Sequence, residues 1–388
     1  MIGASRAVER LSTSQRNLAD KLPTPRTPKV IGLHRGDPSF DTPAYIIEAA
    51  VDAMKHGYTH YPATQGDPQL REAIAAYQSK ISGVEVSPSE VLLTNGGTGA
   101  IYSVMTGLLN EGDQVIILDP TYSLYSDVAK VVGAEVTAVP LTRSFKVDLD
   151  SVRDAVTSRT KMLVLNYPSN PTGQLLDQTE LDGLAEIASQ HDLAVILDEV
   201  YDQLVFTGKH ISGLGHPLLT ERAILVNSFS KTYAMTGWRV GWVVAKGPTL
   251  KPISAINRTS VGYVNNIAMR AALAALTNES EDRKWRSWML GQYQAQREAM
   301  WEGLRSIPGV KVYELQAAFY AWVHYEAPLS AVEMMKYLYE RGLNVRPGTE
   351  FGAMGEGHLR FTFAPSVETI NQGIAIFRAA LEELRAAS

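Results

Sequence analysis

The chain has 388 residues, of which 45% are hydrophobic and 20% charged, so it is long enough for two domains with substantial cores. Its formal net charge of -5 and the lack of a long basic run argue against nucleic acid or an anionic membrane as partner, and favour a small-molecule substrate. The absence of cysteine excludes disulfides and cysteine-ligated metals, and we expect no metal site. The charged first twenty residues differ from a secretion signal and no long apolar run follows, so we expect a cytoplasmic protein.

The chain begins with a segment that differs from the rest. Three prolines between residues 23 and 28 prevent regular structure there, which predicts an amphipathic N-terminal arm with an extended linker over residues 1–29. Short apolar, β-branched runs then alternate with helical patterns, which is typical of a mostly parallel sheet covered on both faces. Seven strands are predicted at residues 91–94, 114–118, 135–139, 162–166, 194–197, 223–227 and 240–245. Such sheets bind ligands at the carboxyl ends of their strands.

The pattern changes beyond about residue 285. A charged helix is predicted over residues 284–304, followed by short strands at 310–313, 319–323, 343–346 and 359–362 and a last helix at 367–386. These elements indicate a smaller α+β domain. We therefore predict an α/β protein with a large domain over residues 48–285 and a small domain formed by residues 30–47 and 286–388.

The segment most informative about chemistry is NSFSKTYAMTGWRVG, which follows the end of a predicted strand. Its Lys231 is flanked by small hydroxyl residues and is followed by Arg239, so an amine nucleophile stands beside an anion-binding guanidinium. Alone, this segment is also compatible with a surface lysine. Two upstream segments argue otherwise: LDEVY ends an apolar strand with Asp198 and Tyr201, and NYPSNPTG contains Asn170.

In this order and spacing, the three segments resemble the class I and II aminotransferases of the fold type I pyridoxal-phosphate superfamily, which are aspartate aminotransferase-like. The resemblance runs from about Val30 to the C-terminus. Its motifs Asn-Pro-Thr-Gly, Asp-x-x-Tyr and Ser-x-Ser-Lys with a later Arg are weak singly and specific together. The resemblance implies a fold type I PLP-transferase with pyridoxal 5'-phosphate as its cofactor.

The resemblance implies a role for each matching residue of the catalytic centre. Lys231 would carry the cofactor as a Schiff base and then move the substrate α-proton as general base, with a pKa lowered by burial and by Arg239. Asp198 would keep the pyridine nitrogen protonated, so that the ring serves as an electron sink. Asn170 and Tyr201 would bond the phenolic oxygen. A helix cap remains the alternative for Asp198, and loop-stabilising roles remain for the other two.

A phosphate cradle at a helix N-terminus is also implied by the resemblance. Its residues are Gly97, Thr98, Ser228, Ser230 and Arg239. Tyr122 matches the aromatic position that stacks on the cofactor ring, with an ordinary core tyrosine as the alternative. The strand, Gly-Gly-Thr-Gly and helix also imitate a dinucleotide-binding unit. That fingerprint needs a small residue where this chain has Tyr102, and it leaves no place for the lysine segment.

Substrate contacts follow from the same resemblance. Arg360 in HLRFTFA matches the arginine that pairs with the substrate α-carboxylate together with Asn170, and a surface salt bridge is its alternative. Gly36 matches the backbone position that closes over this carboxylate. Arg35 is an unusual large charge at its position; it either contacts a polar or acidic substrate side chain or lies on the surface. Tyr61 matches a tyrosine that reaches the neighbouring subunit's phosphate, which implies a homodimer with shared active sites.

The implied function is a PLP-dependent aminotransferase that interconverts an L-amino acid and a 2-oxo acid by a ping-pong mechanism. The scaffold also supports a lyase, cyclase or oxidase acting on an amino acid, because fold and cofactor residues do not fix the reaction. A ligand-sensing regulator built on such a domain is disfavoured, since only 29 residues precede the region of resemblance and a DNA-binding domain needs more. The amino donor and the oxo acid stay open.

Overall fold

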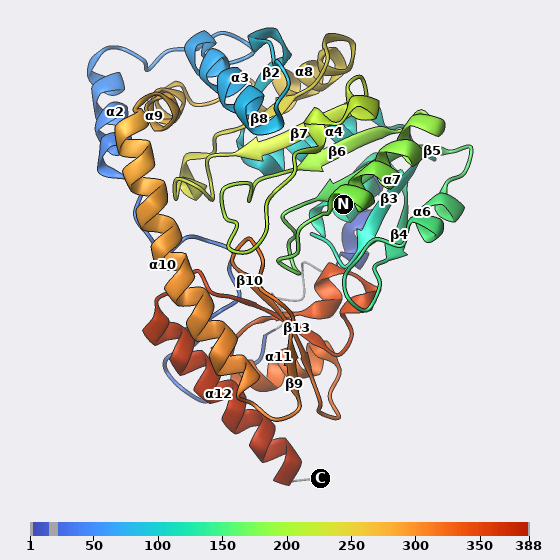
Figure 1. Ribbon diagram of the computed structural model, residues 1–388, viewed down its shortest axis with the longest axis vertical. Coiled ribbons are helices and arrows are strands. Elements are labelled where there is room, and N and C mark those ends of the chain that lie inside the picture. The colour runs from blue at the N-terminus through green and yellow to red at the C-terminus, as the bar shows by residue number, and fades with distance from the viewer. Residues whose placement is uncertain (1–2, 15–21, 387–388) are drawn as a thin grey trace.

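A mostly parallel seven-stranded sheet forms the centre of the larger part of the molecule (Figure 1). The computed structural model describes residues 3–14 and 22–386. The strand order is β2-β8-β7-β6-β5-β3-β4, and β8 runs antiparallel to both of its neighbours. The strands are β2 (Val91–Thr94), β3 (Gln114–Asp119), β4 (Glu135–Pro140), β5 (Thr160–Asn166), β6 (Ala194–Asp198), β7 (Ala223–Ser228) and β8 (Gly241–Val244). The seven strands predicted from apolar runs are confirmed, and so is the α/β class.

Helices cover both faces of this sheet, which explains why its strands are apolar on both sides. Side chains alternate along β5, so Leu163 and Leu165 enter one core while Met162 and Val164 enter the other. The first core lies under α2 (Ala44–Lys55), α3 (Pro68–Ser82), α6 (Leu149–Ala155), α7 (Gln178–Gln190) and α9 (Asn266–Thr277). The second lies under α4 (Gly96–Leu108), α5 (Leu124–Val132) and α8 (Gly247–Val261).

The smaller part is built on a four-stranded antiparallel sheet with its own apolar core. Its order is β12-β13-β10-β9, from β12 (Arg346–Pro347), β13 (His358–Thr362), β10 (Tyr320–Tyr325) and β9 (Val310–Val312). The helices α11 (Ala331–Glu340) and α12 (Val367–Ala386) complete it. The long helix α10 (Glu279–Arg305) runs from the larger part into the smaller one (Figure 1).

Two predicted elements differ in extent from the observed ones. The charged helix begins at Glu279 instead of residue 284, because the Asn278 side chain caps it by accepting from the Glu281 amide. The predicted strand over residues 343–346 is divided. Its first half is β11 (Leu343–Asn344), which pairs in parallel with β1 (Ile31–Gly32), and its second half is β12, which pairs with β13.

Residues 3–14 of the N-terminal arm lie on α5, whereas Arg26 bonds to Glu340 at the end of α11. The arm contains α1 (Arg6–Arg10) and a short 3-10 helix (Leu11–Thr13), and Arg10 forms an ion pair of 2.6 Å with Glu111. The arm prediction also covers residues 1–2 and 15–21, which lie outside the described residues. The domain boundaries at residues 48 and 286 stay a prediction.

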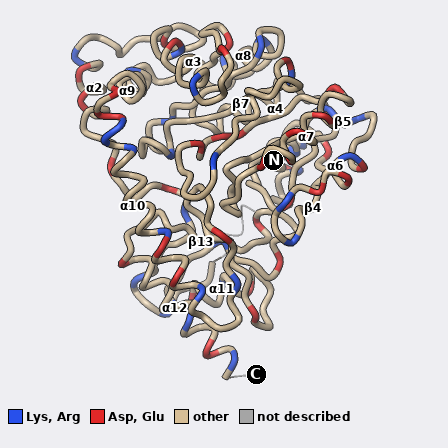
Figure 2. Tube along the Cα trace, viewed as in Figure 1, with Lys and Arg blue, Asp and Glu red and all other residues tan. Residues whose placement is uncertain are grey.

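Charges are mixed over the molecule. Acidic and basic residues are interspersed along the trace in both parts (Figure 2). Within residues 3–14 and 22–386, no helix is both long and apolar enough to span a membrane.

Candidate active site

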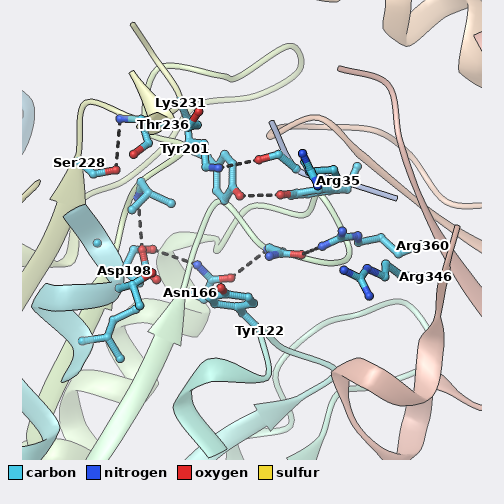
Figure 3. A pocket seen from close by; sticks show the side chains of 18 of the residues that line it. Arg35, Tyr122, Asn166, Asp198, Tyr201, Ser228, Lys231, Thr236, Arg346 and Arg360 are labelled. Atoms are coloured by element: carbon cyan, nitrogen blue, oxygen red, sulfur yellow. Dashed lines mark hydrogen bonds between the residues drawn. The ribbon is translucent and has the colours of Figure 1, made fainter. Parts of the chain in front are cut away.

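A cavity of about 350 Å³ opens where the carboxyl ends of β5, β6 and β7 face the smaller part of the molecule (Figure 3). The topology explains this place, because parallel strands end at one edge of their sheet. The residues predicted from sequence that line the cavity are Gly36, Gly97, Thr98, Tyr122, Asn170, Asp198, Tyr201, Ser228, Ser230, Lys231, Arg239 and Arg360. Side chains far apart in sequence thus meet in one site of a size suited to a small ligand.

Lys231 lies just beyond the end of β7, and its side chain is largely buried in the cavity wall. Its Nζ donates a hydrogen bond of 2.6 Å to the Gly36 carbonyl oxygen. The pKa of Lys231 is lowered to about 8, chiefly by burial and also by the guanidiniums of Arg360 and Arg239, while Asp37 acts in the opposite direction. An amine with such a pKa is partly neutral near pH 7 and can act as a nucleophile and as a base.

Asp198 ends β6 and is only 3% exposed. Tyr125 donates a hydrogen bond of 2.5 Å to its Oδ2. Burial raises the pKa of Asp198 to about 6, while the bonds from Tyr125 and the Val200 amide favour the charged form. The carboxylate faces the cavity and can hold a proton on a basic ring nitrogen.

The N-terminus of α4 supplies an anion site at the opposite wall. Its N-cap Asn95 makes no side-chain capping bond among the described residues, so the amides of Gly97 and Thr98 are available to a ligand. Arg239 packs against this turn, and a Cβ on Gly96 would stand 2.6 Å from its Nη2. Arg239 itself has a φ of 57° and donates a bond of 2.8 Å to the Thr236 carbonyl. Gly96 also has a φ of 71°, and this left-handed backbone conformation favours glycine at the turn.

Arg360 projects from β13 into the other end of the cavity (Figure 3). Its Nη1 donates to Asn170 Oδ1 at 2.9 Å and its Nη2 to the His34 carbonyl at 2.6 Å. The guanidinium carbon lies 4.3 Å from the Tyr320 ring centroid and 4.7 Å from that of Phe351. Its Nε is buried without a hydrogen-bond partner in the described part of the chain. A planar cation held this firmly is suited to a carboxylate.

Two predicted residues behave differently from the rest. Tyr61 lies outside the cavity, where it is 86% exposed and stacks on Tyr263 with ring centroids 4.8 Å apart. Tyr201 lines the cavity, but its hydroxyl is paired with the Tyr320 hydroxyl at 2.7 Å. Tyr320 also explains the glycine at position 36, because a Cβ there would stand 2.0 Å from the tyrosine oxygen.

Sequence reasoning did not place several other residues of the site. These are His34, Tyr125, Thr236, Arg346 and Glu350. Arg346 could have been placed in the site only from the pairing of the strands, since it stands directly opposite Arg360 on the neighbouring strand. Tyr125 lies three residues after Tyr122, a spacing that does not distinguish a carboxylate partner from a core tyrosine.

These features fit pyridoxal 5'-phosphate. The uncapped turn of α4, together with Arg239 and the serines Ser228 and Ser230 beyond β7, suits a phosphate. The buried Asp198 suits a pyridinium, and the low-pKa Lys231 suits an aldehyde. On such a sheet, this arrangement defines a PLP-binding protein of fold type I.

Comparison with known proteins agrees with this class. The model of the family "Aminotransferase class I and II" matches residues 28–377. The chain is 36% identical over 361 residues to an aspartate aminotransferase of Pyrococcus horikoshii, covering 91% of each chain. It is 35% identical over 353 residues to an aspartate/prephenate aminotransferase of Thermus thermophilus, covering 90% of each. A solved aspartate aminotransferase mutant of Thermus thermophilus superposes with a TM-score of 0.89 at 33% identity, over 98% of this chain and 100% of that one.

The chain therefore belongs to the class I and II aminotransferase family. It is a PLP-dependent enzyme that interconverts an amino acid and a 2-oxo acid. The lyase, cyclase and oxidase alternatives find no support in these comparisons.

Proposed function

We propose that this enzyme transfers the amino group of an acidic amino acid such as aspartate to a 2-oxo acid, with Lys231 at the centre of the chemistry. The observation that carries the proposal is the position of Lys231, whose amine lies in one cavity with Asp198 and Arg360. The names of the relatives from Pyrococcus and Thermus support aspartate as the donor. When bound, pyridoxal 5'-phosphate supplies an aldehyde that condenses with amines and a ring that accepts electron density.

The side chains divide the work between cofactor and substrate. Lys231 would hold the cofactor covalently and, once freed by the substrate, would move the proton at the substrate Cα. Asp198 would stabilise a protonated ring nitrogen, and Tyr122 would contact the ring. Asn170 and Tyr201 would supply donors to the phenolic oxygen. The phosphate would be held by Gly97, Thr98, Ser228, Ser230 and Arg239.

The substrate is oriented by Arg360 from the smaller part of the molecule and by the neighbouring loop that contains Gly36. Arg360 binds the α-carboxylate with two parallel hydrogen bonds, beside Asn170. The carbonyl oxygen of Gly36 accepts a hydrogen bond from Lys231 in the structure, and the Gly36 backbone would close over this carboxylate. The carboxylate is thereby fixed relative to the lysine that moves the α-proton.

The test is to incubate the purified enzyme with L-aspartate and 2-oxoglutarate and to measure glutamate formation. Borohydride reduction should fix the cofactor on the peptide that contains Lys231, and Lys231→Ala should lose both the adduct and the activity. Lys209→Ala serves as an exposed matched control. An adduct on a peptide with another lysine would disprove the assignment of Lys231.

We also propose that the enzyme is a homodimer in which Tyr61 reaches the phosphate of the neighbouring active site. The exposure of Tyr61 outside its own cavity supports this arrangement. Tyr61→Ala should then weaken cofactor binding, although its own cavity is unchanged. Mixing this variant with Lys231→Ala subunits should restore one intact site in each mixed dimer. A monomer in light scattering, or no recovery on mixing, would argue against shared sites.

The cytoplasmic location expected from the sequence stays part of this proposal. Fractionation of cells that carry a tagged chain should find it with cytoplasmic markers, and recovery with membranes or in the medium would contradict it.

A further inference from the structure

Two arginines enter the cavity from neighbouring strands. Arg346 on β12 is the direct partner of Arg360 on β13, so both side chains project from the same face of the small sheet. Arg346 lines the cavity and its side chain is only 23% exposed. Like charges at directly opposite positions destabilise a sheet. A second guanidinium beside the proposed α-carboxylate site therefore calls for an anionic partner.

A third arginine adds to the same positive region. Arg35 lines the cavity and is exposed, and its side chain makes no ion pair or hydrogen bond with any residue in the described ranges. Figure 3 shows Arg35, Arg346 and Arg360 on one side of the cavity, across from Asp198. Burial, together with all three guanidiniums, lowers the pKa of His34 to about 4. His34 is therefore neutral, and the positive charge of this wall is borne by the arginines.

After the charges with an assigned role are counted, the cavity wall around Arg35, Arg346 and Arg360 still carries an excess of positive charge. Under the proposed function, Lys231 and Arg239 serve the cofactor and Arg360 serves the α-carboxylate. Arg346 and Arg35 then remain, against the single carboxylate of Glu350. The distance from Arg346 Nη1 to Glu350 Oε2 is 3.4 Å, longer than the 2.7 to 2.9 Å usual for a charge-assisted hydrogen bond. The ion pair is loose and leaves donors of Arg346 available to a ligand.

We propose that Arg346 and Arg35 are specificity-determining residues that bind the side-chain carboxylate of the substrate. This inference rests on the proposed function and assigns residues of this same chain to its acidic specificity. Arg346 supplies a fixed planar fork from the cavity wall, and the exposed Arg35 approaches from the rim. Glu350 keeps Arg346 in place through the loose ion pair and balances one of the two charges while no acidic substrate is bound.

Isosteric substrates test the proposal, because aspartate and asparagine differ in charge but hardly in shape. We would measure kcat/KM for aspartate against asparagine, and for glutamate against glutamine, in wild type, Arg346→Gln and Arg35→Gln. The preference for the acid should fall about tenfold to a hundredfold in Arg346→Gln, as for a lost bond to a charged group. It should fall about twofold to fivefold in Arg35→Gln, since exposed ion pairs are weaker. Arg143→Gln, an exposed arginine outside the cavity, should keep the wild-type preference.

A binding measurement supplies a readout without turnover. Succinate carries two carboxylates and no amine, and succinamate replaces one of them by an amide. Calorimetry should show that wild-type enzyme binds succinate more tightly and that Arg346→Gln binds the two nearly equally. Cofactor absorbance should stay normal in both variants, which shows that they are folded.

The outcomes separate the two proposals. If no amino acid changes the cofactor absorbance of wild-type enzyme, the proposed function is wrong. If amino acids react but wild type treats acids and amides alike, aminotransfer stands, whereas the acidic donor and the assignment of Arg346 and Arg35 are both wrong. If wild type prefers the acids and neither variant changes this preference, the proposed function stands and only the assignment of Arg346 and Arg35 is wrong.

Discussion

Tyr125 donates a hydrogen bond of 2.5 Å to Asp198 Oδ2 in a part of the site from which solvent is excluded. Burial and the nearby carboxylate raise the pKa of Tyr125 well above its usual value, so the phenol keeps its proton and acts as donor. The same bond counteracts the effect of burial on Asp198 and favours its charged form. Tyr125 is thus a positioning residue for the carboxylate that faces the cofactor ring.

Replacement of Tyr125 by Phe should shift the acid limb of the pH-rate profile upward. Loss of a bond to a charged group costs roughly 1.5 to 3 kcal/mol, so the pKa of Asp198 should rise and the rate at pH 7 should fall by about twofold to fifteenfold. The measurement is the half-reaction rate with aspartate from pH 5 to 9. Tyr313→Phe, outside the cavity, is the matched control. A lower rate with an unmoved profile would mean that Tyr125 acts only through packing.

The buried Asp198 carboxylate should destabilise the folded, cofactor-free protein at neutral pH. Its folded pKa of about 6 lies above the unfolded value of 3.8, so the group imposes no penalty below about pH 4 and an increasing one as the pH rises through 6. Asp198→Asn should therefore be more stable than wild type at pH 8, on the order of 2 to 3 kcal/mol, and equal to it near pH 4. Urea unfolding of the two apoproteins at both pH values measures this difference. Equal midpoints at pH 8 would refute the buried-charge explanation.

The fold was predictable because its signals are local. Each strand of the large sheet is an apolar run between helical segments, and burial on both faces produces such runs. The direction of β8 was not predictable from its composition, since an apolar strand reads the same in either direction. The division of residues 343–346 between two sheets depends on pairing with β1, which lies over three hundred residues earlier.

The candidate site was predictable only where its residues belong to motifs. Lys231, Asp198 and Arg360 stand in recognisable segments, and all three line the cavity. Arg346 carries no motif, and only its cross-strand register with Arg360 brings it to the site. The bond between Tyr201 and Tyr320 likewise joins two distant segments, so no spacing in the sequence encodes it.

Asp37 should control how readily Lys231 loses its proton. The nearby carboxylate raises the pKa of Lys231 against the lowering effect of burial, so Asp37→Asn should bring it below about 8. The apoprotein variant should then capture added pyridoxal 5'-phosphate up to several-fold faster at pH 7, where more amine is neutral, and at the same rate at high pH. Stopped-flow absorbance from pH 6 to 10 follows the capture. The exposed Asp41→Asn is the control, and parallel profiles for all three proteins would contradict the role of Asp37.

Arg360→Lys should weaken every substrate while leaving the cofactor untouched. Lysine keeps the charge but loses the planar fork, the bond to Asn170 and the packing between the rings of Tyr320 and Phe351. Arg360→Ala should cost on the order of 2 to 5 kcal/mol of apparent binding, as for other desolvated charge pairs broken at one partner. The apparent binding of amino acids and of 2-oxo acids should weaken equally, because both present the same α-carboxylate.

Half-reaction rates against concentration, for an amino acid and an oxo acid, measure this loss. The comparison with Arg346→Gln separates the two arginines, since loss of Arg346 should spare asparagine whereas loss of Arg360 should weaken aspartate and asparagine equally. Cofactor absorbance should remain normal, because Arg360 lies at the end of the cavity away from the phosphate cradle. If the concentration dependence were unchanged in Arg360→Ala, another arginine would have to bind the α-carboxylate. Arg35 would then be the first residue to test.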